Sequence, residues 1–470
     1  MNNDRFTNYD DEVKQLVLDF ESTVMHGKMQ FYDIDELEMI IDYYLEVDDK
    51  EPLISAIHLG ERLYPDSIEM KIRRAHWYVL NKENAKALSL LQALENQDPS
   101  DTDVSYSLGV VYSEMGESEK AIKYYLRAAE DGWQLGRIYA NIAEEYYRGQ
   151  QWHQAIEYYL KAFRTDSYDE QMLCTYLDTC EQAGVCDEAY EFLNLYVGEH
   201  PYSKIGWYCL GCVCRDLSLC ERAVDAFEYA LAIDNNYTSA YIELSLAYEQ
   251  QDKIGDAATA LTRAIDSAPD RGELYRALGQ LFMRHDNFET AVLYLRKSLD
   301  ENPKDADTLA NLGLCQLRLE DDAAALASAR KAISIDPECA DALLCMAMVY
   351  DCRDNVDAAS DFFERIISSE RCSEHHCRFY TLFLFSHGNY SLLIDFAEES
   401  LEVYPHDLFY STYAAAAYYH TNRYNRLRRI LPDVHPVLLR ELCPEMWDNP
   451  RVAPLLELLP NENNNKNAMQ

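Results

Sequence analysis

Residues 272 to 305 read GELYRALGQLFMRHDNFETAVLYLRKSLDENPKD and predict two amphipathic helices closed by a proline. In the first half, residues at i, i+3, i+4 and i+7 share one helical face: Tyr275, Leu278, Gly279 and Phe282. The second half carries a second stripe, formed by Ala291, Leu295, Ser298 and Leu299. Asp286, with Glu289 three residues later, resembles a capping box and predicts that the second helix starts there.

The chain repeats this unit every 34 residues. Steps of 34 in both directions from Ala291 meet alanine at each position without an insertion: Ala87, Ala121, Ala155, Ala189, Ala223, Ala257, Ala325 and Ala359. A methyl-sized side chain lets two helices approach closely where they cross, whereas a larger side chain would overpack the crossing. The periodicity therefore predicts one elongated stack of helix pairs, although the length alone would favour several globular domains.

Two further repeat positions pair a small residue with a large one. Other copies fill the Gly279 position with Ala75, Gly109, Ala143, Gly211, Ser245, Gly313 and Ala347. One helical turn later, they fill the Phe282 position with Tyr78, Tyr112, Tyr146, Tyr248 and Tyr350. This alternation predicts that small and large side chains interlock between helices.

These positions resemble the tetratricopeptide repeat, a 34-residue unit with a large residue, Leu, Gly, Tyr, Ala, an aromatic residue, Ala and Pro in fixed places. Residues 136–169 match it with Tyr139, Ile142, Ala143, Tyr146, Ala155, Tyr159 and Ala162, and residues 204–237 with Trp207, Leu210, Gly211, Phe227 and Ala230. Prolines fill the last position at Pro65, Pro99, Pro201, Pro269, Pro303, Pro337 and Pro405. The resemblance implies an all-α fold, a right-handed superhelical α-solenoid of stacked antiparallel helix pairs.

The register predicts eleven repeats over residues 34–407 and a degenerate twelfth unit at 408–441. Residues 1–33 are predicted to contain an N-terminal capping helix, because Val13, Leu16, Val17, Phe20 and Val24 have helical spacing. Residues 442–470 are predicted to form a C-terminal cap, with Asn449 and Pro450 at a helix start, followed by a disordered tail. Caps are expected because an end repeat would otherwise expose its apolar side to water.

The chain is strongly acidic, with 82 acidic and 42 basic residues and a formal charge of −40. Such a charge repels phosphate backbones and anionic membrane surfaces, so we expect no nucleic acid partner. The charge can serve solubility alone, or it can recruit basic partners. No segment approaches the roughly 18 apolar residues of a membrane span, and the N-terminal residues do not resemble a signal peptide. We therefore expect no membrane insertion and a cytoplasmic location; association into a homo-oligomer is compatible with the sequence.

The 14 cysteines occur largely at repeat positions held elsewhere by other core residues, which predicts reduced thiols. Four of them, Cys209, Cys212, Cys214 and Cys220, lie in or beside a single predicted helix without a second cluster, which favours packing over zinc binding. The segment CSEHHC offers weak metal candidates in Cys372, His375, His376 and Cys377. We predict no metal or other cofactor.

No phosphate-binding loop, dinucleotide-binding glycine motif, zinc-protease motif or nucleophile elbow occurs in the sequence. The repeats also occupy most of the chain and leave little room for a catalytic domain. We therefore predict no catalytic residues and a protein that is not an enzyme.

The resemblance implies a concave groove lined by the first helix of each repeat, at the positions of Glu273, Arg276, Gln280 and Met283. From the sixth unit onward, we predict that the groove is lined by Tyr208, Cys212, Arg215, Ile242, Leu246, Arg276, Gln280, Asn311, Leu314, Arg318, Leu344, Met348 and Arg378. The arginines could bind carboxylates or carbonyls of a ligand, and the apolar residues its apolar side chains. Alternatively, neighbouring helices bury the aliphatic residues, and the arginines neutralise acids such as Glu243, Asp307 and Asp341.

Some relatives of this family clamp a ligand's terminal carboxylate, and Arg276, Gln280 and Asn311 match that clamp in part. The next repeat offers Asp341 and Cys345 instead of basic residues, so we do not predict such a clamp. The leading hypothesis is a non-enzymatic scaffold or adaptor that binds a peptide or partner protein in the groove. The alternative is a regulatory sensor that changes curvature on binding a small peptide or a metal ion, with residues 372–377 as its natural site.

Overall fold

The computed structural model of the chain describes residues 11–26, 31–47, 49–132, 134–165, 169–265 and 271–460, and every regular element in these ranges is helical. The all-α prediction is confirmed. The tail at 461–470 and parts of the predicted N-terminal cap lie outside these ranges. None of the described helices combines the length and the apolar character that crossing a membrane requires.

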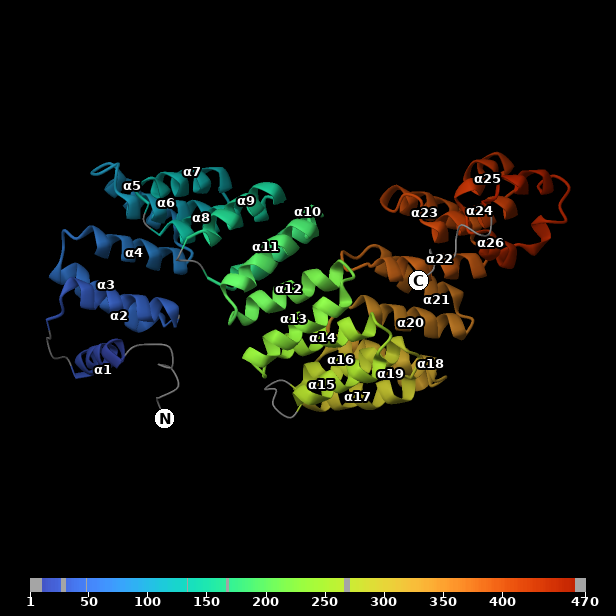
Figure 1. Ribbon diagram of the computed structural model, residues 1–470, viewed down its shortest axis with the longest axis horizontal. Helices are drawn as coiled ribbons and strands as arrows, with labels where there is room; N and C mark the ends of the chain where they lie inside the picture. Colours follow the sequence, from blue (N-terminus) through green and yellow to red (C-terminus); the bar gives the residue numbers. More distant parts are fainter. Residues whose placement is uncertain are drawn as a thin grey trace. The chain divides into compact units, whose positions relative to one another are not determined.

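The chain divides into two units, Met1–Asp234 and Asn235–Gln470 (Figure 1). Unit 1 contains α1 (Asp11–His26), α2 (Ile34–Glu46), α3 (Lys50–Leu63), α4 (Ile68–Leu80), α5 (Asn84–Glu95), α6 (Thr102–Glu114), α7 (Ser118–Ala128), η2 (Ala129–Asp131), α8 (Leu135–Arg148), α9 (Trp152–Phe163), α10 (Met172–Ala183), α11 (Cys186–Glu199), α12 (Lys204–Asp216) and α13 (Cys220–Ile233).

Unit 2 continues with helices of the same lengths and then with shorter elements. It contains α14 (Thr238–Glu249), α15 (Ile254–Ile265), α16 (Arg271–Arg284), α17 (Phe288–Glu301), α18 (Ala306–Arg318), α19 (Asp322–Ile335), α20 (Ala340–Cys352), α21 (Val356–Ile367), α22 (Glu374–Ser386), α23 (Tyr390–Val403), α24 (Leu408–His420), α25 (Tyr424–Ile430), η3 (Leu431–Asp433), α26 (Pro436–Leu442), η4 (Pro444–Met446) and η5 (Ala453–Leu458).

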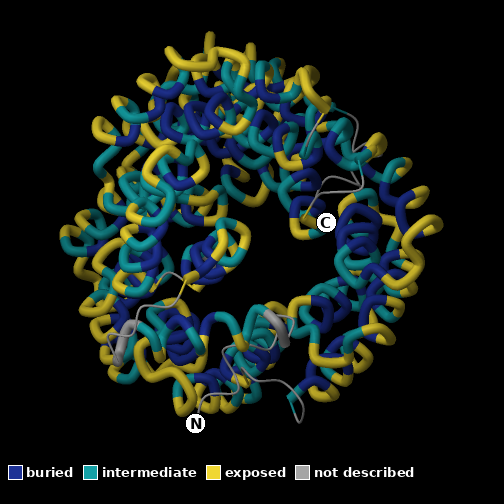
Figure 2. Tube along the Cα trace, turned by 90° about the vertical axis from the view of Figure 1, so that its left-hand side faces the viewer, coloured by how far each residue is buried: buried dark blue, intermediate teal, exposed yellow. Residues whose placement is uncertain are grey.

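From α2 to α25, the helices form pairs in which an even-numbered first helix packs against the odd-numbered second helix that follows it. Within each unit, the second helix also packs against the first helix of the next pair. Each helix is therefore buried on the sides that meet its neighbours, and buried and exposed stretches alternate along the tube in Figure 2. This is the stacked arrangement that the repeats predicted.

The turn that joins the two helices of each pair has the same backbone conformation every 34 residues. Residues with φ between 54° and 73° lie 34 apart, each between a first and a second helix: Lys82, Gly116, Gln150, Gly184, Ser218, Asp252, Asp286, Glu320, Asp354, Gly388 and Asn422. In every case the next residue donates its N–H to the carbonyl five residues back, as Glu83 does to Tyr78 and Asn287 to Phe282. This is the Schellman arrangement, which ends a helix by satisfying its last carbonyls. The repeat register is therefore unbroken from residue 82 to residue 422.

The repeated alanines lie where the sequence predicted close helix crossings. All nine, from Ala87 to Ala359, have no exposed surface. Glycine at the small position of the first helix serves the same approach in the copies where a large residue of the second helix lies against it. A Cβ atom on Gly109 would lie 2.6 Å from the Tyr125 ring, and one on Gly211 would lie 2.4 Å from the Phe227 ring.

Polar side chains cap many of the helices, although one predicted cap is displaced. Asp33 and Glu36 form a complete capping box at the start of α2. At the start of α17 the cap is Asn287, whose side chain accepts a hydrogen bond from the Thr290 N–H, so the prediction of Asp286 was wrong by one residue. Asp286 instead occupies the left-handed position of the Schellman turn, which Asp tolerates better than most residues do.

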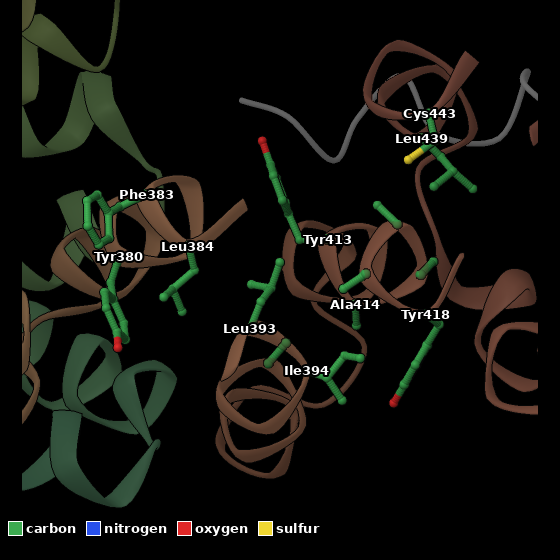
Figure 3. Packing of buried hydrophobic residues seen from close by; sticks show 14 of the residues in the cluster. Tyr380, Phe383, Leu384, Leu393, Ile394, Tyr413, Ala414, Tyr418, Leu439 and Cys443 are labelled. Atoms are coloured by element: carbon green, nitrogen blue, oxygen red, sulfur yellow. The ribbon is translucent and has the colours of Figure 1, made fainter. Parts of the chain in front are cut away.

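The two chain ends carry helices outside the regular pairs. At the N-terminal end, α1 contributes Val17 and Phe20 to a buried cluster with Leu37 and Ile40 of α2. At the other end, Figure 3 shows Leu393 and Ile394 projecting from α23 toward α24, and Leu439 and Cys443 belong to the same buried cluster. The helix start expected at Asn449 and Pro450 lies later in the structure: the Asn449 side chain accepts a hydrogen bond from the Arg451 N–H, as a cap would, but η5 begins only at Ala453.

Candidate functional site

The first helices of unit 1 enclose a polar hollow of about 630 Å³. Its lining comes from four consecutive first helices and the turn before the last of them: Glu38, Asp42, Leu45, Glu69, Ile72, Arg73, His76, Asp103, Tyr106, Ser107, Gln134 and Arg137. Glu69, Asp103 and Arg137 occupy the repeat position of Glu273, and Glu38, Ile72 and Tyr106 occupy that of Arg276. We call this side of α2, α4, α6 and α8 the first-helix face of unit 1.

One arginine in the hollow is already engaged by acids of the preceding repeat. Arg73 of α4 forms an ion pair with Asp42 of α2 at 2.8 Å and lies 3.9 Å from Glu38. Burial raises the pKa of the Glu38 carboxyl, and the Arg73 charge opposes that rise. These three side chains therefore link α2 to α4 and leave little of the Arg73 charge for a ligand.

His76 extends the same polar row toward α6. Its Nε2 atom lies 3.1 Å from the Ser107 hydroxyl. Burial, together with the positive charges of Arg73 and Arg137, lowers the pKa of His76 to about 4. The ring is thus neutral near pH 7 and can exchange a hydrogen bond with Ser107 without adding charge to the hollow.

Two exposed carboxylates, Glu69 and Asp103, also line the hollow. Glu69 accepts a hydrogen bond from the Ser67 hydroxyl at 2.7 Å, which lowers the pKa of its carboxyl. Burial and the nearby negative charges of Asp101 and Glu69 raise the pKa of Asp103, although Arg73 acts against them. An arriving cation would relieve this repulsion, so Glu69 and Asp103 form a subsite suited to a lysine or arginine side chain.

Tyr106 and Arg137 lie next to each other in the lining of the hollow. The Arg137 guanidinium lies 5.1 Å from the centre of the Tyr106 ring. Asn141 donates a hydrogen bond of 3.0 Å to the Tyr106 hydroxyl, which fixes the ring. Arg137 therefore presents donors that match a peptide carbonyl or a carboxylate.

A second hollow, of about 760 Å³, adjoins the first and shares Gln134 and Arg137 with it. It runs along α8 to the start of α10 and is lined further by Ala140, Asn141, Glu144, Tyr159, Asp169, Gln171, Met172 and Thr175. The two hollows together make a continuous recess across the first helices of consecutive repeats. A recess of this kind suits an extended segment better than a compact small molecule.

The groove residues predicted from the sequence lie from the sixth unit onward, and the structure buries several of them. Cys212, Asn311 and Leu344 are between 1% and 7% exposed, because neighbouring helices cover them. Burial also raises the pKa of the Cys212 thiol to about 12. The remaining candidates keep partly exposed side chains: Tyr208, Arg215, Ile242, Leu246, Arg276, Gln280, Leu314, Arg318, Met348 and Arg378.

Each candidate arginine already contacts an acid. Arg276 pairs with Asp305 at 3.1 Å, and Arg318 lies 3.6 Å from Asp286. Arg378 pairs with Glu374 at 2.6 Å and with Asp407 at 3.2 Å. Arg215 pairs with its neighbour Asp216 at 2.9 Å. The idea that these arginines neutralise neighbouring acids thus has direct contacts behind it, although the acids differ from those the sequence suggested.

The four predicted metal candidates of the CSEHHC segment do not converge on one point. Cys372 and Cys377 bring their sulfur atoms within 3.5 Å of each other. His376 instead caps α22 through Ser373 and directs its Nε2 atom at Asp341, 3.1 Å away. His375 packs edge-on against Phe379. The capping role and the contact with Asp341 account for the buried histidine without a metal.

A protein of stacked helix pairs with a 34-residue period belongs to the class of helical-repeat proteins. The sequence model of the tetratricopeptide repeat family matches residues 102–130, 242–306 and 276–340. Together with the helix pairs, these matches show that the chain contains tetratricopeptide repeats. Proteins with these repeats generally mediate protein–protein interactions, and some have peptide-binding sites.

Three relatives illustrate the likeness. The TPR repeat-containing protein YpiA of Bacillus subtilis is 23% identical over 266 residues, which cover 49% of this chain and 54% of YpiA, about half the length of each. Yeast Tom70 aligns with a TM-score of 0.44 and 14% identity over 77% of this chain and 93% of Tom70. YrrB, described as having an unusual peptide-binding site, aligns with a TM-score of 0.29 and 20% identity over 38% of this chain and 91% of YrrB. At such identities, a partner has to be argued from this chain's own residues.

Proposed function

We propose that this protein is a non-enzymatic scaffold or adaptor that holds a peptide segment of a partner protein along the first-helix face of unit 1. The recess across α2, α4, α6, α8 and the start of α10 is the observation that carries the proposal. Binding is the whole mechanism, and the repeats supply a rigid frame whose side chains recur at fixed spacing.

The charges of the recess favour a segment with basic side chains. The first hollow has four carboxylates but only two arginines, and His76 is neutral. Arg73 offsets part of the Glu38 and Asp42 charge, so Glu69 and Asp103 remain to attract a lysine or arginine. Arg137 can then bind a backbone carbonyl of the same segment, while the Tyr106 ring offers an apolar surface.

A peptide-display selection against the purified full chain tests this proposal. We expect the selected peptides to be enriched in lysine and arginine, and their affinity to fall as salt is raised, because exposed ion pairs are screened. The double variant Glu69→Lys/Asp103→Lys should weaken their binding at least tenfold, about 1.4 kcal/mol.

The matched control makes the same change of charge on a second helix. Glu221 and Asp225 are exposed on α13, outside both hollows. The variant Glu221→Lys/Asp225→Lys should bind the selected peptides almost as tightly as the original chain. Equal loss in both variants would mean that only the overall charge matters, and the assignment to the first-helix face would be wrong.

The arginines of unit 2 support a second binding surface for the same scaffold function. The Arg318 guanidinium lies 5.0 Å from the centre of the Phe288 ring, and the Arg378 guanidinium lies 5.1 Å from that of Phe409. Both arginine side chains are about half exposed. A ligand carboxylate could replace their present acidic partners, since exposed ion pairs contribute little net stability. Such a surface would take a segment with acidic and apolar residues.

A further inference from the structure

Three metal-ligating side chains meet near the C-terminal end, in a region without the repeat pattern. His420 lies in the last turn of α24, Cys443 follows α26, and Glu445 lies in η4. The His420 Nε2 atom is 3.3 Å from the Cys443 sulfur and 4.0 Å from a Glu445 carboxylate oxygen. The three ligand atoms all lie within 4.8 Å of one another, and no other such group of three was found among the residues that the structure describes.

These separations fit a tetrahedral zinc ion. Bonds of about 2.3 Å to sulfur and about 2.1 Å to nitrogen or oxygen place the ligand atoms about 3.4 to 3.6 Å apart. The sulfur–nitrogen separation is 3.3 Å, and the nitrogen–oxygen separation of 4.0 Å needs only a small movement of Glu445. Thiolate, imidazole and carboxylate are all zinc ligands, and the exposed side of Glu445 leaves room for water in the fourth position.

The surrounding packing holds two of the ligands in place. The His420 ring stacks on Tyr390 with centroids 4.4 Å apart and an angle of 9° between the planes. Cys443 is fully buried, and its backbone N–H donates to the Leu439 carbonyl at 3.0 Å. Figure 3 shows Cys443 and Leu439 side by side above α24. A site whose ligands are already oriented loses little entropy when an ion binds.

We propose that His420, Cys443 and Glu445 bind a divalent zinc ion. The ion would join the C-terminal end of α24 to the turn that follows α26, and so fasten the last elements of the chain to the repeats. The proposal concerns neither hollow of unit 1 and is independent of the peptide-binding function.

Binding requires the Cys443 thiol to lose its proton to solvent, because the thiolate is the metal ligand. The ion takes the place of that proton and offsets the Glu445 charge. The competing explanation is a simple hydrogen bond between the Cys443 thiol and His420.

Metal analysis and cobalt substitution of the full chain distinguish these explanations. After exposure to Zn²⁺ and removal of excess ion, we expect stoichiometric zinc, and we expect Co²⁺ to give the absorption of a cobalt–thiolate bond. The variant Cys443→Ser should lose both signals. Cys372→Ser, which removes a thiol of the CSEHHC pair, is the matched control and should keep both.

The exposed ligand gives a second variant that does not disturb the core. Glu445→Gln should weaken zinc binding at least tenfold while the protein without metal melts at an unchanged temperature. Zinc should raise the melting temperature of the original chain but not that of Cys443→Ser. Absence of stoichiometric zinc, or cobalt–thiolate absorption that survives in Cys443→Ser, would overturn the proposal.

Discussion

Replacing Ala325 with leucine tests the packing rule that organises the repeats. Ala325 lies on α19, has no exposed surface, and faces the crossing with α18. The closeness of the two helices is visible at Gly313, where an added Cβ atom would lie 3.3 Å from the Ala325 carbonyl oxygen and 3.0 Å from the Cys345 sulfur. Three additional carbon atoms therefore have to push α18 and α19 apart or adopt a strained conformation.

Overpacking of this kind costs about 1 to 3 kcal/mol. For a cooperative unit of roughly 150 to 250 residues, each kcal/mol lowers the melting temperature by about 2 to 4 °C. Unit 2 is of that size, so Ala325→Leu should melt about 2 to 12 °C below the original chain. The loss should extend through unit 2, because each pair depends on its neighbours.

The matched control is Ala327→Leu, which makes the same substitution on the exposed side of α19. Both variants have the same change in helix propensity, so their difference isolates the crossing. Scanning calorimetry of the full chain, with urea unfolding as a second measure, gives that difference. If Ala325→Leu melts with Ala327→Leu, the alanine periodicity does not report close helix crossings and the packing argument is refuted.

Three further predictions concern the turns, the hollow and the arginines. Glu320→Gly should stabilise the chain by about 0.5 to 1 kcal/mol in urea unfolding, and Gly116→Ala should destabilise it by about 1 kcal/mol, because both positions have positive φ. Effects of the opposite sign would contradict the turn assignment. Lowering the pH from 6.5 to 4.5 should destabilise the original chain more than the variant His76→Gln. The reason is that the pKa of His76 is about 4 in the folded chain and 6.5 in the unfolded chain, so the unfolded chain binds the additional proton. Equal losses of unfolding free energy in both proteins would show that His76 is not desolvated. Arg276→Glu/Arg318→Glu should weaken binding of an acidic, apolar peptide at least tenfold, about 1.4 kcal/mol, and unchanged binding by the folded variant would exclude the unit 2 surface.

Much of the fold could be predicted because its cause recurs. A methyl group at every crossing and a recurring small residue in the first helix are visible in sequence, and they mark close helix contacts at Ala291 and at Gly109, where the large partner is Tyr125 of the second helix. The turn position was harder to find, because its requirement is a backbone angle that Lys82 and Glu320 also adopt, although at a conformational cost that Gly116 avoids. That chemical variety also explains why Asp286 was mistaken for a cap.

The candidate sites were less predictable because they depend on how neighbouring repeats meet. The repeat positions predicted to line a groove do line the hollow of unit 1. The sequence could not show that Glu69 of α4 and Asp103 of α6 line a hollow, or that neighbouring helices cover Leu344. His420 and Cys443 are separated by 23 residues and lie where the repeat ends, so no spacing motif linked them. The CSEHHC segment looks more like a metal-binding motif in sequence, yet helix capping directs His376 away from the thiols.

Photo-crosslinking of a selected basic peptide to the full chain tests the central claim most directly. The peptide would carry a diazirine beside its lysine, and mass spectrometry would locate the crosslinked residues. The proposed function predicts crosslinks on α4, α6 and α8, around Glu69, Asp103 and Arg137, and their loss in Glu69→Lys/Asp103→Lys. Crosslinks confined to second helices such as α5 and α7, or unchanged in that variant, would contradict binding along the first-helix face.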